Sequence, residues 1–427
     1  MIRSLMTMAL VFAGVSVAQV PAVGQANPDP ACAVEAVNAV IEWNRTLLVI
    51  VRTPGAQPAT IHSTRNFAML HAAMFDAVTN ITGTFAPYLA SVPGTSAQAS
   101  QPAAADQAAH DVLVSLYPAF QMKLDTQLTQ DLALVPDGQD KVDGINVGQK
   151  VAAAILAARA NDGSAVPQPA YVPGTHPGDY QLTPPNFASA DFTQWPQVTP
   201  FALRRADEFL PPPPPALTSE EYTNVFTEVK SLGLITSTVR TPDQTQIGTF
   251  WNGNIQDFWN EIAQTAALTR HLDLPQTAHL FALLNIALAD TTIAFFEAKY
   301  VYNFWRPVTA IRAADTDNNP NTAPDPAWVP LPTKTAADPS YPGAHSAISF
   351  AAAEVLKLEL GQRLVFDVTS ESLARVTRHF TSFDEAAQEA GLSRIYAGQH
   401  YRTDHVAGKN LGRNVARSIF DSILLAQ

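Results

Sequence analysis

The chain has 427 residues, of which 47% are hydrophobic and only 15% charged, a composition typical of a folded protein with a sizeable core. Asp and Glu number 38 against 26 Lys and Arg, so the formal net charge is −12. This acidic balance argues against nucleic acid and anionic membrane surfaces as the main partners.

The N-terminus has the pattern of an export signal. Arg3 supplies a positive charge, residues 5–17 form an apolar run, and small residues precede candidate cleavage positions after Ala18 and Ala26. The apolar run is too short for a comfortable membrane span. We therefore assign residues 1–26 to a signal peptide and expect a periplasmic or extracellular protein without a stable membrane span. Cys32 is the only cysteine, so no disulfide can form within the chain.

Helical periodicity dominates the rest of the chain, and no stretch has sustained alternation bounded by hairpin turns. The predicted helices cover residues 36–51, 65–78, 103–116, 141–158, 219–232, 244–267, 276–305, 344–360, 370–389 and 393–425. Pro-rich stretches at 161–215 and 315–342 cannot continue a helix. We predict an all-α protein of two helical bundles joined by Pro-rich loops. Its parts are an N-terminal helical half (27–165), a Pro-rich connection with a short helix (166–242) and a C-terminal helical half with the active site (243–427).

The first cluster of chemically informative residues lies at the end of the helix predicted over 276–305. Lys299 and Arg306 are seven residues apart, which is two turns, and so project from one face. Pro307 follows, and because the residue before a proline avoids the α region, we expect the helix to end at Arg306. Cations in this apolar, aromatic segment need an anionic partner or a solvated end. The alternative is a basic helix C-terminus favoured by the macrodipole.

The second cluster is the turn at residues 341–346, with the sequence Tyr-Pro-Gly-Ala-His-Ser. A tight turn that opens a helix presents free backbone N–H groups, here at Gly343 and Ala344, and these can bind an anion. His345 in the first helical turn can exchange a proton with a bound oxyanion near neutral pH. The alternative is an ordinary Pro-Gly turn.

The third cluster is the densest and lies at residues 391–404. Arg394 offers a planar fork suited to an oxyanion. His400 and Asp404 are four apart on a predicted helix, so the carboxylate can accept from one imidazole nitrogen and leave the other free as base, nucleophile or ligand. One alternative is a salt-bridged surface helix. Another is a zinc site formed by His400, Asp404 and His405, against which the neighbouring cations argue.

Together the three clusters resemble the vanadium-dependent haloperoxidase and type 2 phosphatidic acid phosphatase superfamily. Its signature comprises Lys-x6-Arg-Pro, Pro-Ser-Gly-His and Ser-Arg-x5-His-x3-Asp. The corresponding segments here are Lys299-x6-Arg306-Pro307, Pro342-Gly343-Ala344-His345 and Ser393-Arg394-x5-His400-x3-Asp404. The segment 65–78 is similar to the soluble bacterial haloperoxidase branch.

The resemblance implies a role for each matched residue. The equatorial oxygens of vanadate, or of phosphate, would be bound by Lys299, Arg306, Arg394 and the backbone of Gly343 and Ala344. His400 would be the axial vanadium ligand in a peroxidase or the phosphoryl-accepting nucleophile in a phosphatase. His345 would be the acid/base, and Asp404 would orient His400. No haem is needed.

The turn departs from the signature, because Gly343-Ala344 stands where the superfamily has Ser-Gly. Gly343 cannot donate the hydroxyl hydrogen bond of that serine, a loss on the order of 1.5–3 kcal/mol for a bond to a charged group. The backbone donors remain, so we expect oxyanion binding to survive.

Three functions are compatible with these residues. The first is a vanadate-dependent haloperoxidase that uses hydrogen peroxide to oxidise halide, which then reacts with a small organic substrate. The second is an acid phosphatase that hydrolyses phosphate esters through a phosphohistidine. The third is a non-catalytic oxyanion-binding protein, suggested by Gly343-Ala344 and opposed by the intact His345, His400 and Asp404.

Overall fold

The computed structural model describes residues 38–427. The predicted signal peptide, residues 1–26, and Cys32 lie outside the described residues. The described α-helices are α1 (Ala39–Arg52), α2 (Ser63–Thr82), α3 (Gln101–Leu116), α4 (Gln121–Ala133), α5 (Gln139–Arg159), α6 (Glu220–Gly233), α7 (Pro242–Phe250), α8 (Ile255–Thr269), α9 (Leu274–Tyr302), α10 (Pro307–Arg312), α11 (Ala344–Leu360), α12 (Phe383–Tyr396) and α13 (Arg402–Ser422). The strands β1 (Arg363–Thr369) and β2 (Thr377–Ser382) form one antiparallel pair. The all-α prediction is confirmed.

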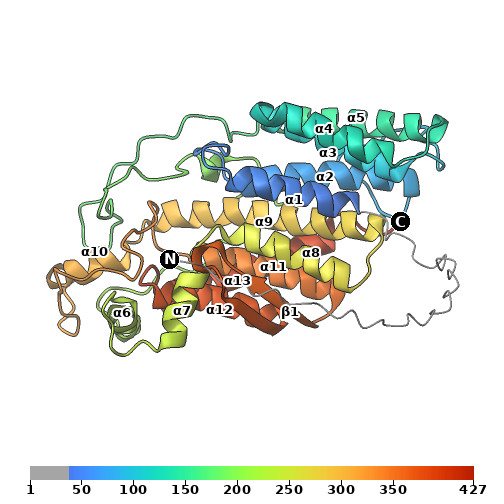
Figure 1. The fold of residues 1–427 in the computed structure, drawn as a ribbon. Helices are drawn as coiled ribbons and strands as arrows, with labels where there is room; N and C mark the ends of the chain where they lie inside the picture. Colours follow the sequence, from blue (N-terminus) through green and yellow to red (C-terminus); the bar gives the residue numbers. More distant parts are fainter. Residues whose placement is uncertain (1–37) are drawn as a thin grey trace, which may run out of the picture. The chain divides into compact units, whose positions relative to one another are not determined.

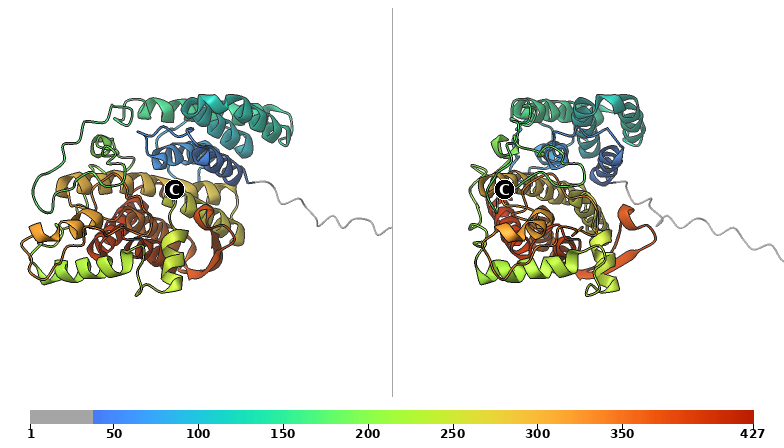
Figure 2. Two further views of the ribbon diagram at one scale, coloured as in Figure 1. Left: turned by 60° about the vertical axis from the view of Figure 1, so that its left-hand side comes forward. Right: turned by 90° about the vertical axis from the view of Figure 1, so that its left-hand side faces the viewer.

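Helix α9 lies at the centre of this part of the chain. It packs against α2 on one side and against α11 and α13 on the other, so that α1 to α5 cover one flank and the C-terminal helices the opposite flank (Figures 1 and 2). A helix apolar on all faces is the pattern expected of one buried on every side. Among the described helices, α9 alone is long and apolar enough to cross a membrane, and its apolar stretch is entirely buried within the protein.

The start of α9 is fixed by a capping box, in which Asp273 and Gln276 satisfy each other's backbone N–H groups. Its far end carries Lys299, which is fully buried. The central helix therefore places the Lys299 ammonium group at the end of the bundle that borders the Pro-rich loops.

Two buried carboxylates hold irregular segments against the helices. Asp290, in the middle of α9, accepts hydrogen bonds from the backbone N–H groups of residues 201–203 at 2.6–2.8 Å. Asp76 of α2 does the same for residues 88–90 at 2.6–2.9 Å. Since an unpaired buried backbone donor is costly, Asp290 fixes the path of the long Pro-rich connection over the bundle, and Asp76 fixes the loop between α2 and α3.

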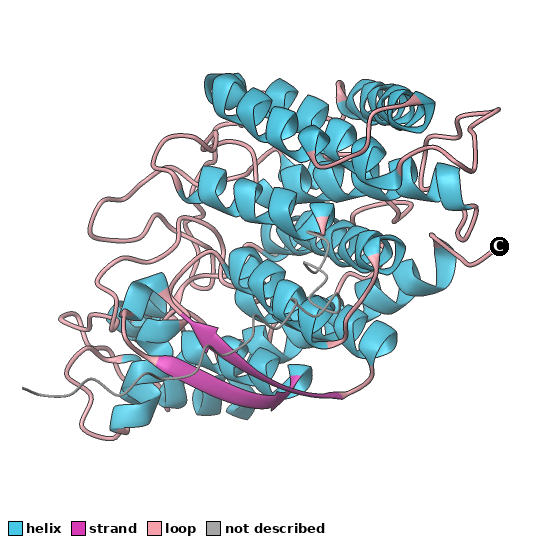
Figure 3. Ribbon diagram, turned by 45° about the vertical axis from the view of Figure 1, so that its right-hand side comes forward, coloured by secondary structure: helices cyan, strands magenta, loops and turns pink. Residues whose placement is uncertain are grey.

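The strand pair corrects one predicted helix. Residues 370–382 were expected to be helical as part of 370–389, but they form the connection after β1 and the whole of β2, and only 383–396 is helix (Figure 3). In β1 the side chains alternate between exposed and buried. Phe366 pairs with Phe380 across the strands, with ring centroids 5.8 Å apart. This period-two pattern of β-branched and aromatic residues is the strand signal that the sequence analysis missed.

Three predicted helices are also shorter or divided. The helix expected over 276–305 ends at Tyr302, because Asn303 adopts a left-handed conformation with φ 50°. The helix expected over 244–267 is interrupted at residues 251–254 between α7 and α8, and that expected over 393–425 is interrupted at 397–401 between α12 and α13. Each interruption borders the candidate site described next. Helix α4 was not predicted.

Candidate oxyanion site

Lys299 and Arg306 meet around a carboxylate that the sequence analysis did not single out. Asp338 Oδ1 accepts from Lys299 Nζ at 2.8 Å and from Arg306 Nη2 at 2.7 Å. Arg306 is the N-cap residue of α10 rather than the last residue of α9, and its extended backbone is the conformation that Pro307 imposes. The prediction that the helix ends at Arg306 is therefore wrong, but the two cations do converge.

Burial makes this cationic environment unfavourable without an anion. It lowers the pKa of Lys299 to about 8, an effect that Asp338 only partly opposes. Arg394, in the last turn of α12, is buried as well, and burial together with the charge of Arg306 lowers its pKa to about 10. We call Lys299, Arg306 and Arg394 the cation cluster. Asp338 is the one carboxylate bonded to it among the described residues.

His400 joins the cation cluster through its outward-facing nitrogen. Its Nδ1 lies 3.0 Å from Asp404 Oδ2, and its Nε2 lies 3.1 Å from Arg306 Nη1. Because a carboxylate accepts and a guanidinium donates, Nδ1 carries the proton and Nε2 presents its lone pair. Burial, and then the charges of Arg306 and Lys299, hold the pKa of His400 well below its ordinary value. The imidazole is therefore neutral, which suits a ligand or a nucleophile.

Asp404 is held by more than His400. Its Oδ2 also accepts from the backbone N–H of Tyr401 at 3.1 Å and from Ser340 Oγ at 2.5 Å, and burial raises its pKa to about 6. His400 itself lies in the turn before α13, while Asp404 lies in the first turn of that helix. The expectation that both stand on one helix is wrong. The two side chains meet because the Asp404 carboxylate points toward the N-terminal end of α13, where His400 lies.

The turn before α11 brings His345 near Arg394 and Arg306 of the cluster. Gly343 is the N-cap of α11, and its N–H donates to the Asp404 carbonyl at 2.9 Å, so the free first-turn donors begin at Ala344. His345 Nε2 donates to the Trp251 carbonyl at 3.0 Å. Burial, and then the charge of Arg394, hold the pKa of His345 well below its usual range. His345 is thus a neutral, half-buried imidazole beside the cations, and it can accept a proton at an anion site.

The loop at residues 251–254 supports two of these side chains. Arg394 Nη1 donates to Asn252 Oδ1 at 3.1 Å, next to the carbonyl of Trp251 that accepts from His345. By contrast, Arg394 Nε is buried without a hydrogen-bond partner. An orphaned guanidinium donor is costly unless an acceptor arrives. Three cations, one carboxylate and this free donor fit a tetrahedral oxyanion such as vanadate or phosphate.

The zinc alternative does not fit the geometry. His405 bonds Ser346 Oγ through Nδ1 at 2.9 Å and lies 3.2 Å from the Gln388 amide through Nε2, so it faces away from His400. No group of three metal-ligating side chains is placed together anywhere within residues 38–427.

Asp338, Ser340 and Asn252 were missed by sequence reasoning. Asp338 and Ser340 lie in the Pro-rich stretch 315–342 and Asn252 in a short interruption, where no periodicity or motif singles out a residue. Only the folded chain shows that each touches a residue of the signature.

The fold and these contacts define a class: a helical protein whose C-terminal bundle carries a buried cluster of cations beside an oriented histidine. A family model described as the VCPO second helical-bundle domain matches residues 279–425. Vanadium chloroperoxidase of Curvularia inaequalis is 24% identical over 276 residues, which is 48% of this chain and 45% of that protein. The match thus spans less than half the length of this curated relative.

Solved structures show similarity over nearly the whole chain. The crystal structure of the first bacterial vanadium-dependent iodoperoxidase is 26% identical, with a TM-score of 0.76, over 92% of this chain and 97% of that one. A holo-type bacterial vanadium-dependent chloroperoxidase shares the fold at 15% identity, with a TM-score of 0.70 over 90% and 97% of the two chains. These matches confirm the resemblance of the chain to the vanadium-dependent haloperoxidase and type 2 phosphatidic acid phosphatase superfamily.

Proposed function

We propose that this protein is a vanadate-dependent haloperoxidase, which uses hydrogen peroxide to oxidise a halide. The observation that carries the proposal is the contact of His400 Nε2 with the cation cluster, at 3.1 Å from Arg306, while Asp404 holds the proton on Nδ1. A neutral imidazole with its lone pair aimed into a cationic site is the arrangement that an oxyanion ligand needs. The relatives named above, an iodoperoxidase and two chloroperoxidases, support this class of activity without fixing the halide.

Each residue would have a definite task. His400 would bind the vanadium through Nε2, and Asp404, itself held by Ser340, would keep the ring in that tautomer. The cation cluster would neutralise the oxyanion. Bound vanadate would supply a Lewis acid that activates peroxide toward attack by halide without changing its own oxidation state. His345 would exchange the proton that peroxide gives up, which its neutral state allows.

Acid phosphatase is the second candidate, because the same lone pair of His400 suits a nucleophile. In that reaction Nε2 would attack the phosphorus atom of an ester, and the bond to the alcohol oxygen would break. His345, which is neutral without a ligand, would bind a proton once the phosphate dianion lies beside it, because a nearby negative charge raises the pKa of the imidazole. It would give that proton to the departing alcohol, and water would then hydrolyse the phosphohistidine. Phosphate and vanadate share shape and charge, so the cation cluster serves both reactions equally.

The test is to prepare the protein without phosphate and to load half of it with orthovanadate. Both halves are assayed for peroxide-dependent bromination of a dione indicator and for phosphate-ester hydrolysis. Bromination that appears only with vanadate, and that added phosphate blocks, would establish the haloperoxidase. Hydrolysis by the vanadate-free half, inhibited by vanadate and without bromination, would instead establish the phosphatase.

A further inference from the structure

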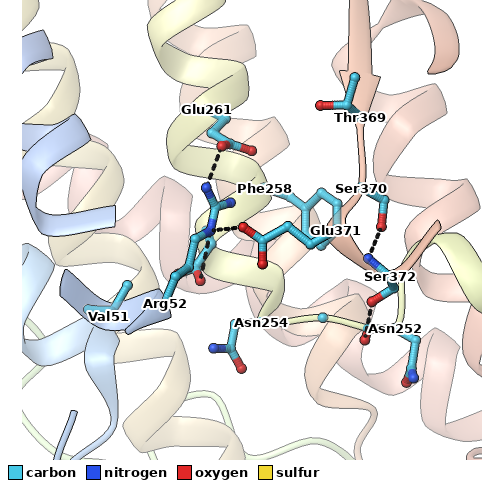
Figure 4. A pocket seen from close by; sticks show the side chains of 12 residues that line it. Val51, Arg52, Asn252, Asn254, Phe258, Glu261, Thr369, Ser370, Glu371 and Ser372 are labelled. Carbon is cyan, nitrogen blue, oxygen red and sulfur yellow. Dashed lines mark hydrogen bonds and ion pairs between the residues drawn. The ribbon is translucent and has the colours of Figure 1, made fainter. Parts of the chain in front are cut away.

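A cavity of about 570 Å³ lies on the far side of the loop that supports His345 and Arg394. It is bounded by the C-terminal end of α1, the start of α8 and the connection between β1 and β2 (Figure 4). Its volume is within the range of small-molecule sites, about 300–1,000 Å³. None of its lining residues belongs to the cation cluster.

The charge of this cavity is opposite to that of the candidate oxyanion site. Three carboxylates, Asp257, Glu261 and Glu371, face a single cation, Arg52. Arg52 bonds Glu261 at 2.7 Å and Glu371 at 3.1 Å (Figure 4). Its nearest approach to Asp257 is 3.9 Å. Glu261 and Glu371 alone outnumber the one arginine. Burial raises the pKa of Asp257 to about 7, so this third acid adds further negative charge as the pH rises through neutrality.

Asp257 is the group that points to a ligand. Its side chain is only 5% exposed, it lines the cavity, and its Oδ1 has no hydrogen-bond partner. A buried carboxylate oxygen left unpaired costs free energy that a donor entering the cavity would recover. The ring of Phe258 and the side chain of Val51 provide an apolar wall beside it. A group with N–H donors, positive charge and an apolar body matches all three features.

The cavity is joined to the candidate oxyanion site through one loop. On the cavity side, Ser370 Oγ bonds the Phe250 carbonyl at 2.5 Å, and Ser372 Oγ bonds the Asn252 carbonyl at 2.8 Å. On the other side, Asn252 Oδ1 accepts from Arg394 at 3.1 Å. A molecule in the cavity is thus separated from the anion-binding side chains by a single layer of backbone.

We propose that this cavity binds a small organic cation, a protonated amine carrying an apolar group, with the amine on Asp257 and the apolar group against Phe258. We further infer that protonated amines of this kind are the organic substrates of the enzyme. This second part rests on the proposed function. The binding part stands independently of any turnover.

Binding is tested by isothermal titration calorimetry of the full chain with phenethylamine and two near-isosteres, neutral phenethyl alcohol and anionic phenylpropionate. We expect the amine to bind at least about tenfold more tightly than either, as a partly buried charge pair allows. Glu371→Arg is the main variant, because the Glu371 side chain is 73% exposed, so we expect its replacement to leave the fold intact. It should weaken amine binding by about tenfold, and Asp257→Asn by more.

The matched control is Asp137→Asn, a fully exposed carboxylate far from the cavity in the chain, which should leave binding unchanged. Equal binding of the amine and the acid, no binding of the amine, or no effect of Glu371→Arg would overturn the inference.

The substrate role is tested by bromination of two phenols that differ only in their side chain, the amine tyramine and the neutral alcohol tyrosol. In Glu371→Arg the Michaelis constant for tyramine should rise, while that for tyrosol stays constant. Unchanged Michaelis constants would refute the substrate role. Absence of all bromination would refute the proposed function and leave the binding result standing.

Discussion

Two buried clusters of cations in this protein have opposite designs. In the first, Arg65 and Arg159 share the Asp162 carboxylate at 2.7 and 2.9 Å. The Arg159 guanidinium also donates to backbone carbonyls of residues 199–200 and lies 3.8 Å from the centre of the Phe201 ring. Every strong donor is satisfied within the protein, so this cluster ties the Pro-rich connection to α2 and α5 and needs nothing further.

The second is the cation cluster of the candidate site. It sets three cations against Asp338 alone, lowers the pKa of Lys299 to about 8, and leaves Arg394 Nε without a partner. The comparison teaches that buried cations as such do not mark a functional site. An uncompensated charge, an orphaned donor and a neutral oriented histidine in the same place do.

The largest expected effect separates chemistry from binding. His400→Ala removes the Nε2 lone pair and should lower turnover by about 10³-fold or more, whichever of the two reactions the protein performs. The variant keeps the cation cluster and should still bind orthovanadate, though more weakly. Steady-state assays and calorimetry measure the two effects, with the exposed His176→Ala as control. Turnover that persists in His400→Ala would show the mechanism to be wrong.

The two clusters should respond differently to loss of a cation. Arg65→Met breaks a satisfied buried pair and should lower the free energy of unfolding by about 3–5 kcal/mol. Arg394→Met removes a cation whose burial is uncompensated, so without an anion the change should stay within about 1 kcal/mol. Urea unfolding in phosphate-free buffer compares the two variants. An equal loss of unfolding free energy in the two variants would mean that both clusters are equally well compensated.

An oxyanion should stabilise only the protein that keeps the cation cluster. Phosphate at about 100 times its dissociation constant should raise the free energy of unfolding by about 2.7 kcal/mol through mass action. Arg394→Met should lose most of this gain, while Arg65→Met, though less stable, should keep it. Thermal unfolding with and without phosphate provides the measurement, and an equal gain in Arg394→Met would place the anion elsewhere.

The lowered pKa of His400 predicts a dependence on pH. In the unfolded chain the pKa of His400 is about 6.5. Below that pH the unfolded chain binds a proton at His400 that the folded chain does not bind, so the free energy of unfolding falls as the pH falls toward the folded pKa. Replacing the group with His400→Gln should therefore reduce the acid loss of stability by about 1.4 kcal/mol per pH unit in this window. Unfolding free energies of the two proteins at several pH values test this, and parallel curves would contradict it.

The smallest effect concerns the departure at Gly343. A Cβ at this position would meet the Asp404 carbonyl oxygen at 3.2 Å, which is tight but accommodated by a small shift, and the backbone φ of −75° suits any residue. Gly343→Ser should add a hydroxyl donor and tighten vanadate binding by about fivefold, since part of the hydrogen-bond gain is spent on that shift. Gly343→Ala carries the same Cβ without the donor and is the control. Equal affinities of the two variants would show that the hydroxyl does not reach the oxyanion.

The helical class, which the structure confirms, and the candidate site residues could both be predicted because both depend on local sequence patterns. The apolar period of 276–305 predicted the central helix, and the spacing of Lys299, Arg306, Arg394 and His400 matched a superfamily signature. Contacts between distant segments were not accessible in this way. Asp338 pairs with Lys299 across 39 residues of sequence, and no local pattern states that their side chains meet.

Errors concentrated at helix ends, where tertiary contacts outweigh propensity. His400 was expected within a helix, but the chain turns at 397–401, where Gly398 has a φ of 72° and packs directly on Gly233 of α6. That close approach, invisible in the sequence, separates α12 from α13 and frees His400 to face Arg306. The missed strand pair has a different cause, since its alternation lies in one short segment beside strongly periodic helices.

The most direct test of the central claim is a crystal structure of the protein loaded with orthovanadate in phosphate-free buffer. We expect vanadium bonded to His400 Nε2, with the vanadate oxygens contacting Lys299, Arg306 and Arg394, and the hydrogen bond between His400 Nδ1 and Asp404 retained. Vanadate bound elsewhere, or a cation cluster without vanadate under saturating conditions, would contradict it.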